Sequence, residues 1–207
     1  MSATRVVLCR HGETDPSALG RFCGELDAGL SPRGAAEADA LAAALVGELP
    51  VALFTSPARR ARETAERIGS RLGLEPIVEP RLREIDFGEL DGLPFEEVEA
   101  RWPELYGEWL RAPTRVQFPG GECYRDLRRR AVDALADVTA LHPGRTAVIV
   151  THAGVIRALI ATWLSLPDEA VFRIDQRYAS VNVVDWPDGT PVLRLLNGPP
   201  TSLGRNA

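Results

Sequence analysis

Two of the three histidines in this 207-residue chain stand in the same kind of position, directly after an apolar run. His11 follows "TRVVLCR" and precedes Gly12, and His152 follows "RTAVIVT" and precedes "AG". Imidazole has a reference pKa of about 6.5, so much of it is unprotonated at neutral pH and can act as a nucleophile. Either histidine alone could be only a hydrogen-bonded polar residue at a strand end. Their shared placement indicates chemistry, whereas His142, in "ALHPG", fits a structural helix C-terminus.

Arginine supplies every basic side chain that could serve these histidines. All 24 basic residues are arginines and none is a lysine, which excludes Schiff-base chemistry and a P-loop lysine. Arg10 adjoins His11, and Arg59, Arg60 and Arg62 open the helical pattern after the second apolar run. Guanidinium groups bind phosphate as forks, and helix N-termini add N–H donors. The sequence therefore predicts an anion site.

A group of acidic residues could supply the proton donor that such a site needs. Hydrolysis of a phosphomonoester by a histidine nucleophile requires a donor for the leaving alkoxide. The segment "LREIDFGELDG" (82–92) follows a short predicted strand and contains four carboxylates. Most of them fit a solvated acidic turn, and their spacing alone does not select one. The candidates are Glu84, Asp86, Glu89 and Asp91.

Composition excludes several other classes of protein. A net charge of −5 is unlike a nucleic-acid-binding protein, and no apolar run is long enough to predict a membrane span or a signal peptide. The cysteines Cys9, Cys23 and Cys123 are odd in number and scattered, which predicts a cytoplasmic protein without a disulfide framework. No Cys/His cluster indicates a metal, so we expect neither a metal nor another cofactor.

Apolar strand patterns alternate with helical patterns, which predicts an α/β fold with a sheet covered on both faces. We expect one domain over 1–207: a three-layer α/β/α sandwich whose mostly parallel central sheet ends in a C-terminal hairpin. Residues 93–118 look helical but interrupted, and are expected to form an insertion or lid; 198–207 are expected to be loose. The predicted strands are 4–10, 51–56, 75–79, 145–152, 180–186 and 191–197, and the predicted helices are 30–49, 58–73, 122–142 and 153–166.

Seven short motifs, taken together and in this order, resemble the histidine phosphatase superfamily, also called phosphoglycerate mutase-like. They are "RHGET" (10–14), "GRFCG" (20–24), "LSPRG" (30–34), "SPARRARETA" (56–65), "LREIDFGELDG" (82–92), "PGGE" (119–122) and "THAGVIR" (151–157). The resemblance spans about residues 4–197. It implies the phosphoglycerate mutase-like fold and a metal-independent phosphomonoesterase that works through a phosphohistidine.

The resemblance also implies a role for each matching residue. His11 matches the nucleophile, Glu84 the general acid, and His152 the second histidine, which donates to the phosphoryl oxygens. The implied phosphate-binding residues are Arg10, Arg60, Ser17, Cys23 and Gly24, the last two in a loop that lines the pocket. Two positions depart from the family pattern: Ser17 stands where the family often has Asn, and Ala153 where it usually has Gly.

The reaction and its substrate are less defined by the sequence. The short separation of Glu84 and His152, 68 positions, favours a phosphatase over a phosphoglycerate mutase, which in this family carries a longer insertion there. Residues 172–197 resemble α-ribazole phosphatases of cobalamin biosynthesis, although broad-specificity sugar and phosphoglycerate phosphatases share much of this pattern. Some members of the superfamily have lost catalysis and act as binding proteins. A small phosphomonoester is the expected partner, and a homodimer is left open.

Residues 93–118 offer two ways of choosing a substrate. Five aromatic residues there either pack the segment onto the body or form an apolar wall for a flat base. Three arginines in or near the same segment could instead hold a substrate carboxylate, as 3-phosphoglycerate would need. The aromatic residues are Phe95, Trp102, Tyr106, Trp109 and Phe118; the arginines are Arg101, Arg111 and Arg115.

Overall fold

The computed structural model describes residues 3–203, which form a central six-stranded sheet in the order β3-β2-β4-β1-β5-β6. Strands β1 to β4 run parallel, β1 lies between β4 and the antiparallel β5, and β6 pairs antiparallel with β5. The predicted closing hairpin is therefore present. The strands are β1 (Thr4–Arg10), β2 (Ala52–Thr55), β3 (Ile77–Val78), β4 (Thr146–Thr151), β5 (Val181–Trp186) and β6 (Val192–Gly198).

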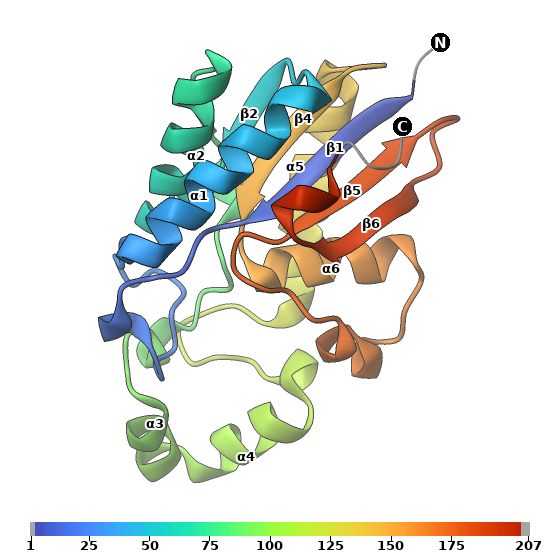
Figure 1. Cartoon of the computed structure of the whole chain (residues 1–207). Helices are drawn as coiled ribbons and strands as arrows, with labels where there is room; N and C mark the ends of the chain where they lie inside the picture. The colour runs from blue at the N-terminus through green and yellow to red at the C-terminus, as the bar shows by residue number, and fades with distance from the viewer. Residues whose placement is uncertain (1–2, 204–207) are drawn as a thin grey trace.

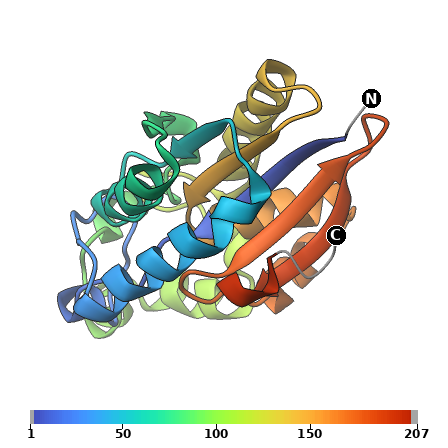
Figure 2. The ribbon, with the colours of Figure 1, turned by 45° about the horizontal axis from the view of Figure 1, so that its top comes forward.

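Helices cover both faces of the sheet (Figures 1 and 2). One apolar core lies between the sheet and α1 and α2, and a second lies between the sheet and α5 and α6. The predicted three-layer α/β/α sandwich with a mostly parallel sheet is confirmed. The helices are α1 (Pro32–Leu45), α2 (Arg59–Leu72), α3 (Phe95–Arg101), α4 (Pro103–Arg111), α5 (Tyr124–Leu141) and α6 (Ala153–Trp163).

Short 3-10 helices occupy many of the connections. They are η1 (Pro16–Ala18), η2 (Val46–Glu48), η3 (Pro80–Leu82), η4 (Gly88–Leu90), η5 (Pro113–Arg115), η6 (Asp168–Arg173) and η7 (Pro200–Ser202). Among the described residues, no helix is both long and apolar enough to cross a membrane.

The start of α1 is packed tightly against the chain that leaves β1. Ser31 caps the helix by accepting a hydrogen bond from the N–H of Gly34 at 3.0 Å, and Pro32 occupies the first turn. A Cβ on Gly34 would collide with the carbonyl of Glu13, and one on Gly12 would collide with the carbonyl of Gly34. The two glycines therefore allow the backbone after β1 and the backbone at the start of α1 to pack directly against each other. This packing fixes the turn that follows His11.

The segment expected as an insertion forms α3, α4 and η5, below the sheet in Figure 1. The helix breaks at Trp102 because Pro103 begins α4. The rings of this segment pack around Phe22, whose centroid lies 4.8 Å from that of Trp109 and 5.1 Å from that of Phe95. A third apolar cluster thus forms between α3–α4 and the loop that carries Phe22.

The expectation of a loose tail is wrong for residues 198–203. Gly198 still belongs to β6, η7 follows, and Leu203 packs against the core between the sheet and α1. Burial of one leucine there gives the tail an apolar contact that its Gly-Pro-Pro start does not suggest. The remainder of the predicted loose tail, 204–207, lies outside the described residues.

Candidate active site

The two strand-end histidines lie against each other. Strands β1 and β4 are neighbours and end in register at Arg10 and Thr151, so the next residue of each strand reaches the same edge of the sheet. The rings of His11 and His152 are 5.1 Å apart between centroids, and the residues are 5% and 1% exposed. The N–H of His11 donates to the carbonyl of Thr151 at 3.0 Å, which ties the two strand ends together.

The tautomer of His11 follows from one hydrogen bond. Its Nδ1 lies 2.8 Å from the carbonyl oxygen of Gly12, and a carbonyl can only accept. Nδ1 must therefore carry the proton. The neutral ring then has its lone pair on Nε2, the nitrogen that a nucleophile would use.

Both imidazoles are held in the neutral form. Burial lowers the pKa of His11 well below its usual value, and the charges of Arg60 and Arg10 lower it further. Burial, and then Arg60, His11 and Arg10, lower the pKa of His152 in the same way. The Nε2 lone pair of His11 is therefore free at neutral pH.

His152 has one ring nitrogen engaged and one without a partner. Its Nε2 lies 2.7 Å from Oγ of Ser56, and its Nδ1 is buried without a hydrogen-bond partner among the described residues. Oγ of Ser56 also accepts the N–H of Ala58 at 3.2 Å, which orients the hydroxyl. Ser56 was not singled out from the sequence, although it lies in the motif that contains Arg60.

Arg10 is held over the site by the chain that leads into β5. Its Nη1 donates to the carbonyl of Gln176 at 2.6 Å, and its guanidinium lies 4.0 Å from the ring centroid of Tyr178. The same ring lies 5.6 Å from that of His11. Nε of Arg10 is buried without a partner among the described residues, so this arginine keeps unused donors.

Arg60 is the buried member of the three arginines at the start of α2. It is 1% exposed, whereas Arg59 is ion-paired with Glu63 on the surface and Arg62 is exposed. Its guanidinium donates to the carbonyls of residues 23, 24 and 26 at 3.0–3.1 Å. Three of its five N–H donors are thus used by the loop, and two remain for a ligand.

The loop that was predicted to line the pocket contacts Arg60 through its backbone carbonyls. Cys23 and Gly24 both accept from Arg60, while the N–H of Gly24 donates to Asp91 at 2.6 Å. A Cβ on Gly24 would collide with the carbonyl of Ile85, so glycine permits this approach. Burial raises the pKa of the Cys23 thiol.

Glu84 lies at the N-terminus of α6, beside the histidine pair. Its carboxylate accepts the N–H of Gly154 at 3.0 Å and the N–H of Ile85 at 2.9 Å. Among the other candidates, Asp86 caps the N–H of Gly88 at 2.8 Å, and Asp91 holds the loop described above. Those two carboxylates have structural contacts away from the histidines, and Glu89 is exposed, so Glu84 is the candidate best placed beside the histidine pair.

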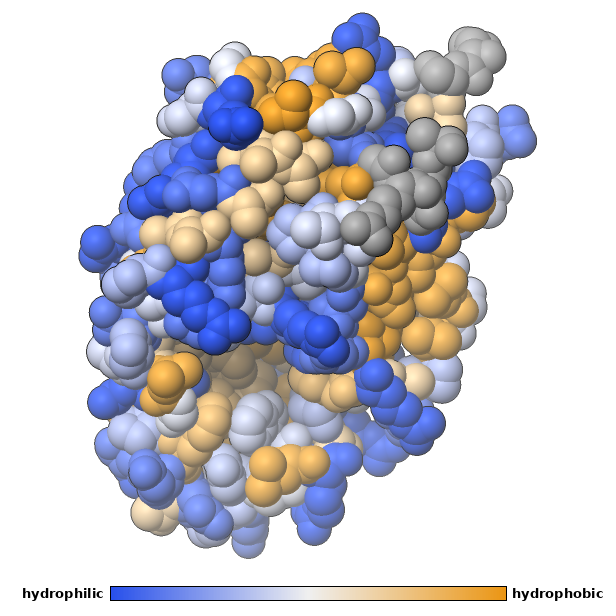
Figure 3. Space-filling model, in the orientation of Figure 1, coloured by the Kyte–Doolittle hydropathy of each residue, from blue (hydrophilic) through white to orange (hydrophobic). Residues whose placement is uncertain are grey.

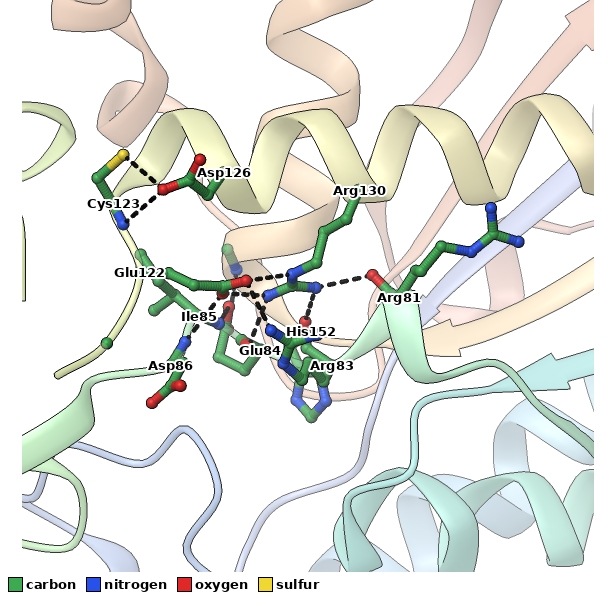
Figure 4. A network of polar contacts seen from close by, with 12 residues as sticks. Arg81, Arg83, Glu84, Ile85, Asp86, Glu122, Cys123, Asp126, Arg130 and His152 are labelled. Atoms are coloured by element: carbon green, nitrogen blue, oxygen red, sulfur yellow. Dashed lines mark hydrogen bonds and ion pairs between the residues drawn. The ribbon is translucent and has the colours of Figure 1, made fainter.

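A network of hydrogen bonds around Arg130, which the sequence did not predict, positions the segment around Glu84 (Figure 4). Arg130, from α5, donates to the carbonyls of Arg81, Arg83 and Glu84 at 2.6–2.8 Å and pairs with Glu122 at 2.7 Å. The only sequence signal was Glu122, the last residue of the "PGGE" motif. Arg130 lies in a run of arginines, a pattern that is typical of a solvent-exposed helix face.

Ser17 is the predicted site residue that the structure does not join to this group. It is exposed in η1, and its N–H donates to the carboxylate of Asp15 at 2.9 Å. Its role in phosphate binding stays a prediction.

The assembled groups suit a phosphoryl ligand. A neutral imidazole lone pair, an imidazole nitrogen without a partner, two guanidinium groups with free donors and a carboxylate meet at the edge of the sheet. Figure 3 shows the surface hollowed between the α/β body and the α3–α4 segment, toward which the ends of β1 and β4 point in Figure 1. Within residues 3–203, no group of three or more His, Cys, Asp or Glu residues is placed to hold a metal ion.

Comparison with known proteins identifies the class. The family model of the histidine phosphatase superfamily (branch 1) matches residues 6–199, so the chain belongs to this superfamily. The chain is 33% identical to phosphoserine phosphatase 1 of Hydrogenobacter thermophilus over 93% of its length and 92% of the relative.

Two solved structures show the same fold. A mycobacterial glucosyl-3-phosphoglycerate phosphatase superposes with a TM-score of 0.85 at 32% identity, covering 95% of this chain and 99% of the other. The α-ribazole phosphatase of Shigella flexneri gives a TM-score of 0.84 at 26% identity, covering 94% and 96%. Together with the family match, these relatives make the chain a phosphoric monoester hydrolase of the histidine phosphatase superfamily.

Proposed function

We propose that this protein is a metal-independent phosphomonoesterase that forms a phosphohistidine on Nε2 of His11. One observation carries the proposal: the Nδ1 proton of His11 is committed to the carbonyl of Gly12, which leaves a neutral Nε2 lone pair beside Arg10 and Arg60. The two arginines supply the positive charge that a metal would otherwise provide to the phosphoryl oxygens.

In the first step, Nε2 of His11 attacks phosphorus and the bond to the leaving oxygen breaks. Arg10, Arg60 and Nδ1–H of His152 donate to the three equatorial oxygens, where charge spreads in the transition state. Because a phosphoryl oxygen can only accept, His152 must carry its proton on Nδ1, and the Ser56 hydroxyl then donates to Nε2. Glu84 protonates the departing alkoxide.

In the second step, water replaces the histidine at phosphorus. Glu84, now a carboxylate, takes a proton from the water as its oxygen bonds to phosphorus. The bond between phosphorus and Nε2 breaks, and inorganic phosphate leaves. Both steps use the same groups in opposite order, as microscopic reversibility requires, and no cofactor enters either step.

The test is to trap the intermediate. Wild-type protein mixed with a labelled phosphomonoester and quenched in base should carry an acid-labile label on His11, and vanadate should inhibit turnover. His11→Ala should fall to about 1% of wild-type activity or less, since removing a nucleophile costs orders of magnitude. His142→Ala is the matched control, because His142 lies at the far end of α5 against Phe54.

Three results would contradict the proposal. They are retention of most activity by His11→Ala, a label that survives acid, and loss of activity on chelation that a divalent ion restores.

For the physiological substrate, more than one candidate is kept. α-Ribazole 5′-phosphate stays a candidate, supported by the similarity to an α-ribazole phosphatase and by residues 172–197. The packing of the rings in 93–118 does not favour the apolar wall that this substrate would use. Trp109 is engaged with Phe22, Phe95 and Tyr106, and Trp102 is stacked under Arg101 at 4.3 Å.

A substrate panel separates the candidates. Values of kcat/KM for α-ribazole phosphate, phosphoserine, 3-phosphoglycerate and a sugar phosphate should differ by more than tenfold if one class is preferred. An excess of tenfold or more for 3-phosphoglycerate over α-ribazole phosphate rules out a base-binding wall.

Two further features belong to the proposal. We place the protein in the cytoplasm, because Cys9, Cys23 and Cys123 are all free thiols. A small phosphomonoester is its partner, and sedimentation would decide between a monomer and a homodimer.

A further inference from the structure

One more partly buried arginine beside the candidate site forms no direct ion pair with a carboxylate. In the described chain, 13 arginines form an ion pair with a carboxylate. Of the ten other described arginines, seven are exposed, where water solvates the charge. The only described arginines that are neither exposed nor ion-paired are Arg10, Arg60 and Arg157. Arg10 and Arg60 form the proposed phosphate clamp. We therefore ask whether Arg157 also binds a negatively charged group of the ligand.

Arg157 lies one turn inside α6, on the side of the helix that faces Glu84. It is three residues after Gly154, where a Cβ would meet the carboxylate of Glu84, and residues three apart share a helix face. Its Nε donates to the carbonyl of Ile174 at 2.8 Å, which fixes the guanidinium but leaves the terminal nitrogens without a hydrogen-bond partner among the described residues. Its charge interacts with those of Glu84, Asp175 and Arg10, so it lies near the reacting groups without a direct ion pair.

The surroundings of Arg157 include a second unused donor. Its guanidinium lies 5.4 Å from the ring centroid of Phe172, and the ring of Tyr124 lies 6.4 Å from that of Phe172. Tyr124 is 3% exposed, and its hydroxyl has no hydrogen-bond partner among the described residues. Burial raises the pKa of Tyr124, so the phenol stays protonated and does not supply the missing negative charge. The neighbouring Arg128 is already paired with Asp168 at 3.1 Å.

We propose that Arg157, assisted by the hydroxyl of Tyr124, binds a carboxylate on the leaving group of the substrate. A guanidinium with free terminal nitrogens matches the two oxygens of a carboxylate, and its partial desolvation strengthens the contact. The subsite lies on the Glu84 side of the phosphate clamp, where the leaving oxygen must be in order to receive a proton. The preferred substrates are therefore phosphate esters of hydroxy acids.

This assignment differs from the one that the sequence suggested. Of the three arginines considered for a substrate carboxylate, Arg101 is paired with Glu97 at 2.9 Å and Arg115 with Glu169 at 3.1 Å. Arg111 is exposed. None of the three combines partial burial with an unpaired charge.

The test compares two esters that differ only in the carboxylate. 3-Phosphoglycerate and glycerol 3-phosphate share the phosphorylated alcohol, and one carries a carboxylate where the other carries a hydroxymethyl group. In the wild type, kcat/KM should favour 3-phosphoglycerate by about tenfold or more. Arg157→Gln should remove most of this preference, because a hydrogen bond to a charged group is worth about 10- to 100-fold. Arg157→Lys should retain part of it, and Tyr124→Phe should lose a smaller part.

Arg173→Gln is the matched control, because Arg173 is exposed, unpaired and next to Phe172 in sequence. It should leave the preference unchanged. The proposal is overturned if the wild type does not distinguish the two esters, or if Arg157→Gln slows both equally, as a purely structural role would.

The subsite rests on the proposed function, and two measurements keep the two apart. Labelling of His11 by p-nitrophenyl phosphate tests the phosphohistidine without any carboxylate. Calorimetric affinities of His11→Ala for the two esters test the subsite without turnover. A labelled His11 with equal affinities overturns the subsite alone, and unequal affinities without a label overturn the mechanism alone.

Discussion

Replacing Ser56 by alanine should impair catalysis through a residue that does not touch the substrate. The side chain is fully buried, and its Oγ lies 2.7 Å from Nε2 of His152. In the proposed mechanism the Ser56 hydroxyl donates to Nε2, which keeps the proton of His152 on Nδ1, facing the phosphoryl group. Ser56→Ala removes that preference, so the ring can place its proton on either nitrogen.

The size of the effect follows from the contacts that disappear. The substitution leaves Nε2 of His152 and the N–H of Ala58 without their partner, and a buried polar group left unpaired costs about 1–3 kcal/mol. Unfolding free energy should fall by about that amount. A tautomer preference of the same size keeps about 80% or more of His152 in the Nδ1–H form, and without it about half of the molecules carry the proton on Nε2, so kcat/KM should fall about twofold.

Steady-state kinetics with p-nitrophenyl phosphate and urea unfolding measure the two effects, and nitrogen NMR of the His152 ring reports which nitrogen carries the proton. Ser56→Thr keeps the hydroxyl and should restore most of kcat/KM. The reasoning is refuted if Ser56→Ala retains wild-type kcat/KM and wild-type stability, or if its His152 still carries the proton on Nδ1 while activity is lost.

Three further outcomes are expected. Glu84→Gln should slow an alkyl phosphate about 10²- to 10⁴-fold but a nitrophenyl phosphate much less, because only the alkoxide needs a proton; equal losses in the kinetics would place the acid elsewhere. Burial and arginine charges hold the pKa of His11 and His152 below 6.5, so only the unfolded chain gains these protons as pH falls. Urea unfolding should therefore show stability lost between pH 6.5 and 5, by up to about 2 kcal/mol per histidine, and less loss in a double Gln variant. Gly34→Ala should lower the unfolding free energy by about 1–3 kcal/mol because its Cβ meets backbone, whereas Gly47→Ala, which meets nothing within 4 Å, should not.

The strands and the histidine pair could be predicted from the sequence because their signals are local. The apolar runs that end at Arg10 and Thr151 define β1 and β4, and parallel strands bring their C-terminal ends to one edge. Arg60 needed more than periodicity: its neighbours Arg59 and Arg62 are chemically identical, and only the family motif distinguished it. Its burial against carbonyls of residues 23–26 depends on a loop more than 30 residues away.

The parts that could not be predicted depend on distant contacts. Arg130 lies among Arg128 and Arg129 on α5, and nothing local shows that it alone turns inward to three carbonyls of the loop at 81–84. The tail was misjudged for the same reason, since Leu203 is ordered by the core beneath α1. The rings of 93–118 were considered as either packing or binding groups, and the contacts of Trp109 and Trp102 favour packing.

Buried polar atoms without hydrogen-bond partners give a physical reason to expect ligand binding at the same place as the sequence motifs indicate. Within the described chain, three buried side-chain atoms have no hydrogen-bond partner: Nε of Arg10, Nδ1 of His152 and the hydroxyl of Tyr124. Each costs about 1–3 kcal/mol in the folded state, so a fold retains such groups where something else satisfies them. Two of the three belong to the proposed phosphate site, and the third lies near Arg157, the remaining half-buried arginine without an ion pair. Unpaired donors and unpaired charge therefore converge on one region from separate observations. They extend it from the phosphoryl group toward the leaving group, which is where a hydrolase that recognises phosphate through arginine must distinguish one ester from another.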